Sequence, residues 1–235
     1  MFRIHHYLIV LAVFSHLIFF VSGCKEPEYN IGSILNPEYY EKVKPQPIIE
    51  ADNSLDRSIW QKPGLVVRKI GDVSDKVIAD IGVGTGFFLF KIAPRSKQWI
   101  AIDIDPKYII YIDSVKNTLP PEIAAKIITR MASPDNPNLK INEVDIVLII
   151  NTVAYIPDLP RYFENLKKYM KDDAEVIIID YKMKQLPINA PPRSERIYLD
   201  QLEMILTSAG YEIMESDDTS LDFQYIIKAK KAEAF

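Results

Sequence analysis

An α/β fold with a doubly wound parallel sheet is predicted by three features of this 235-residue sequence. Short apolar runs of strand length alternate with helix-like segments along most of the chain. One run, from Val144 to Ile150, is almost continuously apolar, as is typical of a parallel strand buried on both faces. Near the C-terminus two strand-like segments follow each other across a short turn at 217–220, and such a pair must be antiparallel.

The individual elements follow from apolar spacing and from residues that begin or end helices. Ser54 is a plausible N-cap, Pro106 suits the first turn of a helix, and Gly210 suits the position just past a helix end. We find no internal repeat and no second domain. Strands are predicted at 77–81, 98–103, 126–131, 144–150, 175–180, 211–216 and 221–228. Helices are predicted from Ser54 through 63–70, and at 87–93, 106–117, 159–170 and 198–209.

Residues 1–23 have the pattern of a secretory signal peptide. A start with Arg3 precedes an apolar run from Tyr7 to Val21, which is short for a membrane span of about 20 apolar residues. The Val21–Cys24 segment resembles a bacterial lipobox, which implies a lipid on Cys24 and an exported protein anchored at the periplasmic or outer membrane. The alternative is an uncleaved signal anchor or a wrongly assigned start codon, the latter giving a cytoplasmic protein, and His16 within the apolar run favours it.

The rest of the chain divides into a tether and one domain. Residues 24–53 are polar and contain Pro27, Pro37, Pro45 and Pro47, without a periodic apolar face. Such a composition is typical of a semi-extended linker. Residues 54–235 are therefore predicted to form the folded domain.

Composition excludes several classes of chemistry. All three histidines lie in the first 16 residues, and Cys24 is the only cysteine. A domain without histidine or a further thiol cannot carry a Ser-His-Asp triad, a Cys-His pair or a zinc site built on those ligands. We expect no metal. The net charge of −4 and the absence of a Lys/Arg cluster also give no reason to expect nucleic acid.

A cluster of glycines marks the predicted ligand site. Gly82, Gly84 and Gly86 follow the first strand directly and precede a helix, where glycine allows a tight turn and close approach of backbone to a ligand. A dinucleotide fingerprint would need glycine where Phe87 stands, and no Gly-Lys-Ser/Thr of a P-loop is present. The pattern Asp80-Ile-Gly-Val-Gly-Thr-Gly86 therefore fits neither of these two nucleotide-binding loops.

This loop resembles motif I of the class I S-adenosylmethionine-dependent methyltransferases. The resemblance implies that Asp80 contacts the methionine end of the cofactor and that the glycine loop lies along the cofactor. It also implies that Asp103, at the end of the second strand, accepts hydrogen bonds from the ribose hydroxyls. Asn151, at the end of the fourth strand, also matches and is expected at the cofactor. The family's Rossmann-like sheet has the strand order 3-2-1-4-5-7-6 with the last strand antiparallel, and the terminal pair fits it.

The resemblance is uneven along the domain. Arg57 and Trp60 match a segment that covers the cofactor in some relatives, although a core tryptophan and a surface ion pair are equally open. In the acceptor half, Val153-Ala154-Tyr155 and Glu195 stand where relatives often carry histidine, while Arg196 is kept. The cofactor half is thus intact and the acceptor half altered.

We therefore predict a methyltransferase that uses S-adenosylmethionine on a small or membrane-associated acceptor. Methyl transfer depends mainly on orientation, so the missing histidine is tolerable. Tyr155, Asp180 and Glu195 are the remaining candidates for a base; Tyr155 could instead face the sulfonium with its ring, and packing or surface roles stay open for all three. The alternative function is a non-catalytic, exported and lipid-anchored binding module, since a methyl donor made in the cytoplasm conflicts with export.

Overall fold

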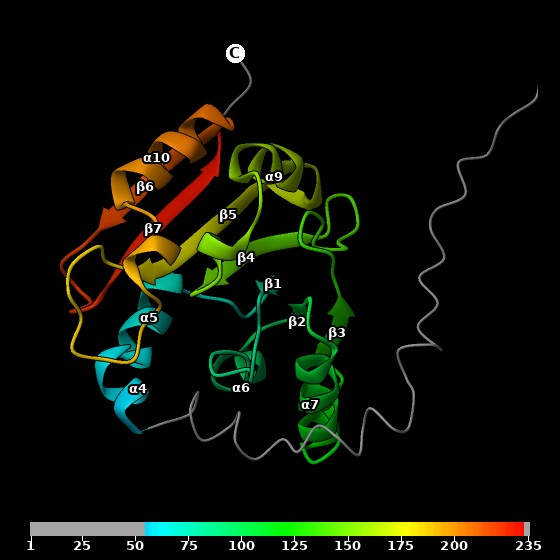
Figure 1. Ribbon diagram of the computed structural model, residues 1–235. Coiled ribbons are helices and arrows are strands. Elements are labelled where there is room, and N and C mark those ends of the chain that lie inside the picture. Colours follow the sequence, from blue (N-terminus) through cyan, green and yellow to red (C-terminus); the bar gives the residue numbers. More distant parts are fainter. Residues whose placement is uncertain (1–54, 233–235) are drawn as a thin grey trace, which may run out of the picture.

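A single seven-stranded sheet organises the part of the chain that the structure describes, residues 55–232 of a computed structural model (Figure 1). The signal peptide, Cys24 and the tether lie outside the described residues. The strand order is β3-β2-β1-β4-β5-β7-β6, and β7 runs antiparallel to both β5 and β6 while all other pairs are parallel. The predicted fold class and strand order are confirmed.

The bounds of the elements are as follows. The strands are β1 (Val77–Ile81), β2 (Gln98–Asp103), β3 (Ile127–Met131), β4 (Val144–Ile150), β5 (Met170–Tyr181), β6 (Tyr211–Asp217) and β7 (Gln224–Lys231). The helices are α4 (Leu55–Trp60), α5 (Pro63–Ile70), α6 (Leu89–Ile92), α7 (Pro106–Lys116), α8 (Pro121–Ala124), α9 (Leu159–Leu166) and α10 (Leu199–Ser208).

Helices cover both faces of the sheet, so its central strands are buried on both sides. On β4, Val147 and Ile149 join a core with residues of α9 and α10, while Ile146, Leu148 and Ile150 join a second core with residues of α5, α6 and α7. Successive strand residues point to opposite faces. The continuous apolar run 144–150 is therefore required by burial on two faces.

Some element ends differ from those predicted. Strand β5 begins at Met170 because Met170 pairs with Val144 before a bulge, and Glu175 resumes the pairing at Ile146. Helix α9 accordingly ends at Leu166 and a 3-10 turn leads into β5. Strand β7 begins only at Gln224, since the preceding residues form the turn after β6. Local sequence pattern does not reveal where a neighbouring strand stops pairing.

Proline explains two shorter helices. Pro94 has no N–H to continue α6, which gives way to a 3-10 turn from Ala93 to Arg95. Lys62 precedes Pro63 and adopts a left-handed conformation with φ 47°, so the first helical region is divided into α4 and α5. Within residues 55–232 no helix is both long and apolar enough to cross a membrane.

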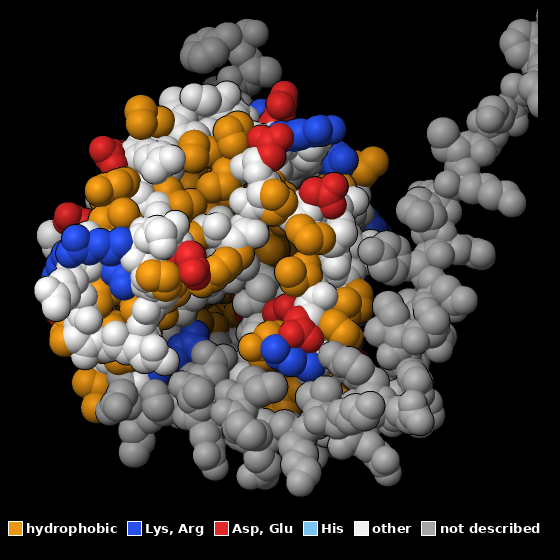
Figure 2. Space-filling view, viewed as in Figure 1, with side chains coloured by type: hydrophobic (Ala, Val, Ile, Leu, Met, Phe, Trp, Pro, Cys, Tyr) orange, Lys and Arg blue, Asp and Glu red, His pale blue; other side chains and the backbone are white. Residues whose placement is uncertain are grey.

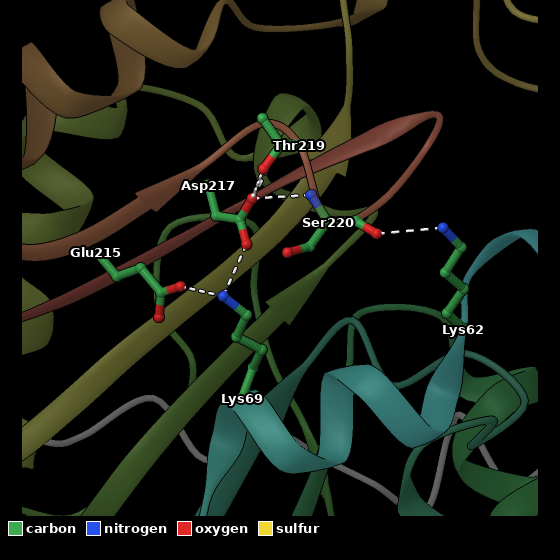
Figure 3. A network of polar contacts seen from close by, with 6 residues as sticks. All are labelled: Lys62, Lys69, Glu215, Asp217, Thr219 and Ser220. Atoms are coloured by element: carbon green, nitrogen blue, oxygen red, sulfur yellow. Dashed lines mark hydrogen bonds and ion pairs between the residues drawn. The ribbon is translucent and has the colours of Figure 1, made fainter.

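Polar contacts fasten α5 to the turn between β6 and β7 (Figure 3). Lys69 Nζ lies 2.7 Å from Asp217 Oδ2 and also contacts Glu215. Asp217 Oδ1 in turn accepts hydrogen bonds from the N–H groups of Thr219 and Ser220. At the other end of α5, Lys62 Nζ donates to the carbonyl of Ser220 at 3.2 Å. These contacts hold the helical pair α4–α5 near the carboxyl end of the sheet.

Candidate functional site

The glycine loop between β1 and α6 is shaped by three residues with positive φ. Gly82, Gly84 and Gly86 have φ values of 77°, 52° and 77°, a region that side chains other than glycine rarely adopt. A Cβ atom on Gly82 would lie 2.3 Å from Oγ1 of Thr152, and one on Gly86 would lie 2.8 Å from Ile112 Cδ1. The loop therefore requires glycine both for its conformation and for its packing.

Asp103 closes the loop from the end of β2. Its Oδ2 accepts a hydrogen bond from the Gly84 N–H at 3.0 Å, and its Oδ1 accepts one from the Asp105 N–H at 3.0 Å. Burial raises the pKa of Asp103 above its ordinary value, while these two amides act in the opposite direction. A buried carboxylate beside a glycine loop can accept hydrogen bonds from a ligand's hydroxyl groups.

Asp80 lies at the end of β1, and it points to the same face of the sheet as Asp103. Its side chain is buried, and this burial, followed by the nearby charge of Asp103, raises its pKa to about 7. Trp99 and the guanidinium of Arg57 act in the opposite direction. Two buried carboxylates close together, both with a raised pKa, are common at ligand-binding and catalytic sites.

Helix α4 lies against the loop and the carboxyl ends of the strands. The Arg57 guanidinium carbon lies 4.4 Å from the centre of the Phe87 ring, just past Gly86. Trp60 packs 6.0 Å from Tyr181 and 6.4 Å from Phe223, ring centre to ring centre. Arg57 is thus placed beside the glycine loop, whereas Trp60 packs against aromatic side chains at the ends of β5 and β7.

Asn151 lies at the end of β4, where its φ is 59° and its N–H donates to the carbonyl of Ile179. Its side-chain oxygen accepts a hydrogen bond from Gln224, which in turn accepts one from Gln61 at 3.0 Å. The sequence predicts Gln61 only as part of the segment with Arg57 and Trp60, and it gives no sign of Gln224. The two glutamines are 163 positions apart, and no local pattern connects them.

A second group of polar residues surrounds the end of β5. Tyr155 donates a hydrogen bond to Glu195 at 3.2 Å, and partial burial together with Glu195 raises the pKa of Tyr155. Arg196 donates to the carbonyls of Pro191 and Lys182, so it holds the loop after β5 in place. A tyrosine with a raised pKa stays protonated near neutral pH, so Tyr155 is a poorer base than an ordinary tyrosine.

Asp180 belongs to this second group and not to the glycine loop. It is 2% exposed and points to the face covered by α9 and α10, whereas Asp80 and Asp103 point to the opposite face. Its Oδ1 accepts from the Tyr181 N–H, while its Oδ2 has no hydrogen-bond partner among the described residues. Burial raises the pKa of Asp180 to about 6.

The molecular surface is hollowed where the strand ends meet. In the view of Figures 1 and 2, the ends of β1, β2 and β4 lie around the centre, and the space-filling surface recedes there. A separate cavity of about 430 Å³ lies beside the end of β5. It is lined mainly by the loop after β5 and by α10, including Lys182, Tyr198, Glu203 and Tyr225.

The residues around the glycine loop fit an S-adenosyl ligand. The three glycines with positive φ turn the backbone tightly after β1, which lets a ligand approach the main chain closely, and Asp103 offers carboxylate oxygens beside the loop. Asp80 provides a second carboxylate on the same face. Across residues 55–232, no group of three or more metal-ligating acidic, histidine or cysteine side chains is assembled.

Comparison with known proteins gives a consistent result. The methyltransferase domain family matches residues 72–230, more than half of the chain. The chain is 30% identical to magnesium-protoporphyrin O-methyltransferase of Rhodobacter capsulatus over 99 residues, which cover 41% of the chain and 42% of that protein. It is 28% identical to chondramide synthase cmdD of Chondromyces crocatus over 110 residues, which cover 47% of the chain and 3% of that protein. The chain thus spans less than half the length of each of these two relatives.

Solved structures share the fold at low sequence identity. A SAM-dependent methyltransferase from Aquifex aeolicus superposes with a TM-score of 0.70 at 21% identity, covering 80% of this chain and 98% of that one. The [4+2]-cyclase SpnF superposes with a TM-score of 0.63 at 14% identity, covering 74% and 81%. The family match, the strand order and the glycine loop agree, and the chain belongs to the methyltransferase domain family, whose cofactor is S-adenosylmethionine.

Proposed function

We propose that this protein transfers a methyl group from S-adenosylmethionine to a small acceptor bound at the carboxyl end of the sheet. The observation that carries the proposal is the contact between Asp103 and Gly84, which joins a buried carboxylate to a loop of left-handed glycines. Asp103 would accept the ribose hydroxyls, and the glycine loop would lie along the ligand. Asp80 and Asn151 would surround its other end.

Bound S-adenosylmethionine supplies an electrophilic methyl group on a sulfonium. The protein's part is to hold the acceptor in line and to exclude water, and such orientation can lower a barrier by several kcal/mol. The Tyr155–Glu195 pair stands at the acceptor side, and Tyr155 keeps its proton there. We therefore propose that Tyr155 orients an acceptor by donating a hydrogen bond and that the acceptor arrives already nucleophilic.

The cavity beside β5 supports a small acceptor. Its volume of about 430 Å³ is within the range of small-molecule sites. Its lining holds both signs of charge, with Lys182 and Lys184 facing Asp200, Glu203 and Asp218, and it therefore favours a polar acceptor. A membrane-associated acceptor is compatible with the same cavity if only its head group enters.

Calorimetric titration tests the cofactor part of the proposal. S-adenosylmethionine and S-adenosylhomocysteine are titrated into the wild type, into Asp103→Ala and into Asp75→Ala, which alters an exposed carboxylate just before the start of β1. We expect micromolar binding by the wild type and the Asp75 variant, and loss of binding in Asp103→Ala. Equal binding by all three proteins would remove Asp103 from the site.

A non-catalytic binding module is the second candidate function. It is favoured by the absence of histidine beyond His16 and by the altered residues from Val153 to Tyr155. Formation of S-adenosylhomocysteine is measured with a panel of small polar acceptors of either charge. If any acceptor raises the rate of S-adenosylhomocysteine formation above the rate measured without acceptor, the binding module is excluded. If the protein binds the cofactor but no acceptor raises that rate, the binding module is favoured.

We also propose that Cys24 carries a lipid that anchors the protein to a membrane after export. The pattern Val21-Ser-Gly-Cys24 supports it, and these residues lie outside the described part of the chain. The test is metabolic labelling with a radioactive fatty acid in a bacterial host. Label on the wild type that is lost in Cys24→Ala would support the anchor, whereas an unlabelled wild type in the cytoplasmic fraction would overturn it.

A further inference from the structure

A chain of hydrogen bonds between four side chains runs under α4. Arg57 Nε donates to Gln61 Oε1 at 2.7 Å, and Gln61 Nε2 donates to Gln224 Oε1 at 3.0 Å. Gln224 Nε2 then donates to Asn151 Oδ1. Gln61 and Gln224 are fully buried. We call these four residues the amide relay.

Only one direction of hydrogen bonding is possible along the amide relay. A guanidinium group has N–H donors and no acceptor, so Gln61 must turn its oxygen toward Arg57. Gln61 then has only its NH₂ group to offer to Gln224, and Gln224 has only its NH₂ group to offer to Asn151. Reversing any one amide would leave buried polar atoms without partners. Arg57 therefore fixes the orientation of the Asn151 side chain three hydrogen bonds away.

The consequence is that Asn151 is left with a donor. Its Oδ1 is occupied by Gln224, and none of the hydrogen bonds among the described residues uses its Nδ2. An asparagine whose orientation was not fixed could present either its oxygen or its NH₂ group to a ligand. Here only the NH₂ group remains.

Both ends of the amide relay lie against the glycine loop. Arg57 stacks over Phe87, immediately after Gly86. At the other end, Thr152 follows Asn151 and occupies the space in which a Cβ on Gly82 would fall. Asn151 is therefore the chain neighbour of the residue that packs on the glycine loop, and we expect a group bound over the loop to come within reach of its NH₂ group.

We propose that the amide relay makes Asn151 an obligatory hydrogen-bond donor to an oxygen acceptor, such as a carboxylate, of the S-adenosyl ligand. Arg57, Gln61 and Gln224 are then positioning residues that act through Asn151. This inference rests on the proposed function, because it assumes that an S-adenosyl ligand occupies the loop. The inference adds that the site favours ligands that place a hydrogen-bond acceptor opposite the NH₂ group of Asn151.

The decisive variant is Asn151→Asp, studied in the full chain by titration with S-adenosylhomocysteine. Aspartate tolerates the left-handed backbone and keeps an oxygen for Gln224, but it replaces the remaining donor by an acceptor. We expect binding at least tenfold weaker than that of the wild type. The matched control is Asn142→Asp, which makes the same change at an exposed asparagine with φ 52° and should bind as the wild type does.

Substitutions at Arg57 test whether this residue sets the orientation of Asn151 through the amide relay. Arg57→Gln can accept as well as donate, so it no longer fixes the direction of the relay, and we expect several-fold weaker binding. Arg57→Lys donates only, and it should restore most of the affinity. Equal loss in both Arg57 variants would overturn the relay, because it would assign the effect to the guanidinium itself.

Nuclear magnetic resonance of the wild type gives a readout that does not depend on whether a variant folds. The side-chain NH₂ signals of Asn151, assigned by triple-resonance spectroscopy, should shift when S-adenosylhomocysteine is added. Unmoved signals, or wild-type affinity in a folded Asn151→Asp, would overturn the inference and leave the proposed function intact. No binding to the folded wild type would overturn the proposed function, and the inference with it.

Discussion

The carboxylate of Asp103 accepts a hydrogen bond from the backbone N–H of Gly84 across 3.0 Å, so the end of β2 and the glycine loop form one unit. The carboxylate is buried, and burial raises its pKa, so its negative charge opposes folding. The buried charge of Asp103 thus destabilises the ligand-free fold, and such groups are common at binding sites.

This relationship predicts that a substitution at Asp103 weakens cofactor binding but hardly changes the stability of the fold. Asp103→Asn keeps one oxygen for the loop amide but loses the charge and one acceptor. We expect cofactor affinity to fall at least tenfold, while the free energy of unfolding changes by less than about 1 kcal/mol because the lost hydrogen bond and the relieved burial of charge offset each other. Calorimetry and urea unfolding measure the two quantities, and a large loss of stability would contradict the argument.

Gly82→Ala is expected to be severely destabilising. The added Cβ would lie 2.3 Å from Oγ1 of Thr152, at a φ of 77° that alanine rarely adopts. Overpacking and backbone strain together should cost about 2–4 kcal/mol of unfolding free energy.

The matched control for this variant is Gly64→Ala in α5. Its nearest neighbour would be the flexible end of Arg68 at 3.8 Å, and its φ is not positive. Alanine there should be neutral or stabilise by about 0.5 kcal/mol. Equal urea midpoints for the two variants would show that the glycine loop accommodates the added Cβ atom without loss of stability.

Asp180→Asn is expected to stabilise the protein in a pH-dependent manner. Burial raises the pKa of Asp180 from 3.8 to about 6, with the amides of Tyr181 and Val153 and the charge of Arg196 acting in the opposite direction. The folded state therefore binds the proton more tightly than the unfolded state does. The resulting penalty is absent below about pH 4, grows between pH 4 and 6, and is complete above pH 6.

Urea unfolding at pH 4 and pH 8 checks this sign. Asparagine cannot ionise, so the variant should gain up to about 3 kcal/mol over the wild type at pH 8 and nothing comparable at pH 4. The exposed Asp75→Asn serves as the control for a lost surface charge. A variant that is less stable than the wild type at pH 8 would mean that the charged form of Asp180 has a partner that stabilises it.

Lys69→Met is expected to loosen the attachment of α4–α5. Partial burial raises the pKa of Asp217, but the hydrogen bonds from Lys69, Ser220 and Thr219 outweigh it and hold that pKa well below its ordinary value. The charged Asp217 therefore stabilises the fold at neutral pH, and this contribution is lost only as the pH falls below about 4.

We expect Lys69→Met to cost about 1 kcal/mol at pH 7 and less at pH 3, measured by thermal unfolding. Hydrogen exchange should also accelerate in α5. Lys76→Met is the control, since its partner Asp75 is well exposed and their ion pair of 3.3 Å should contribute little. Equal effects of the two variants would show that the network in Figure 3 adds no more than a surface ion pair.

The sequence by itself determined the elements whose cause is local. The run 144–150 had to be a strand buried on both faces, and the glycines from Gly82 to Gly86 had to form a tight loop, because each signal lies within a few consecutive residues. Pro106 and Gly210 marked helix ends for the same reason. The order of the strands came from a resemblance, and the structure confirms it.

Tertiary structure alone decided which distant side chains meet. Gln61 reaches Gln224 across 163 positions, and Lys69 reaches Asp217 across 148. It also placed Asp180 on the opposite face from Asp80 and Asp103, although all three end strands of the same sheet. Hydrogen bonds and burial depend on which elements pack together, and strand pairing and helix packing set that arrangement over distances that no local pattern of residues encodes.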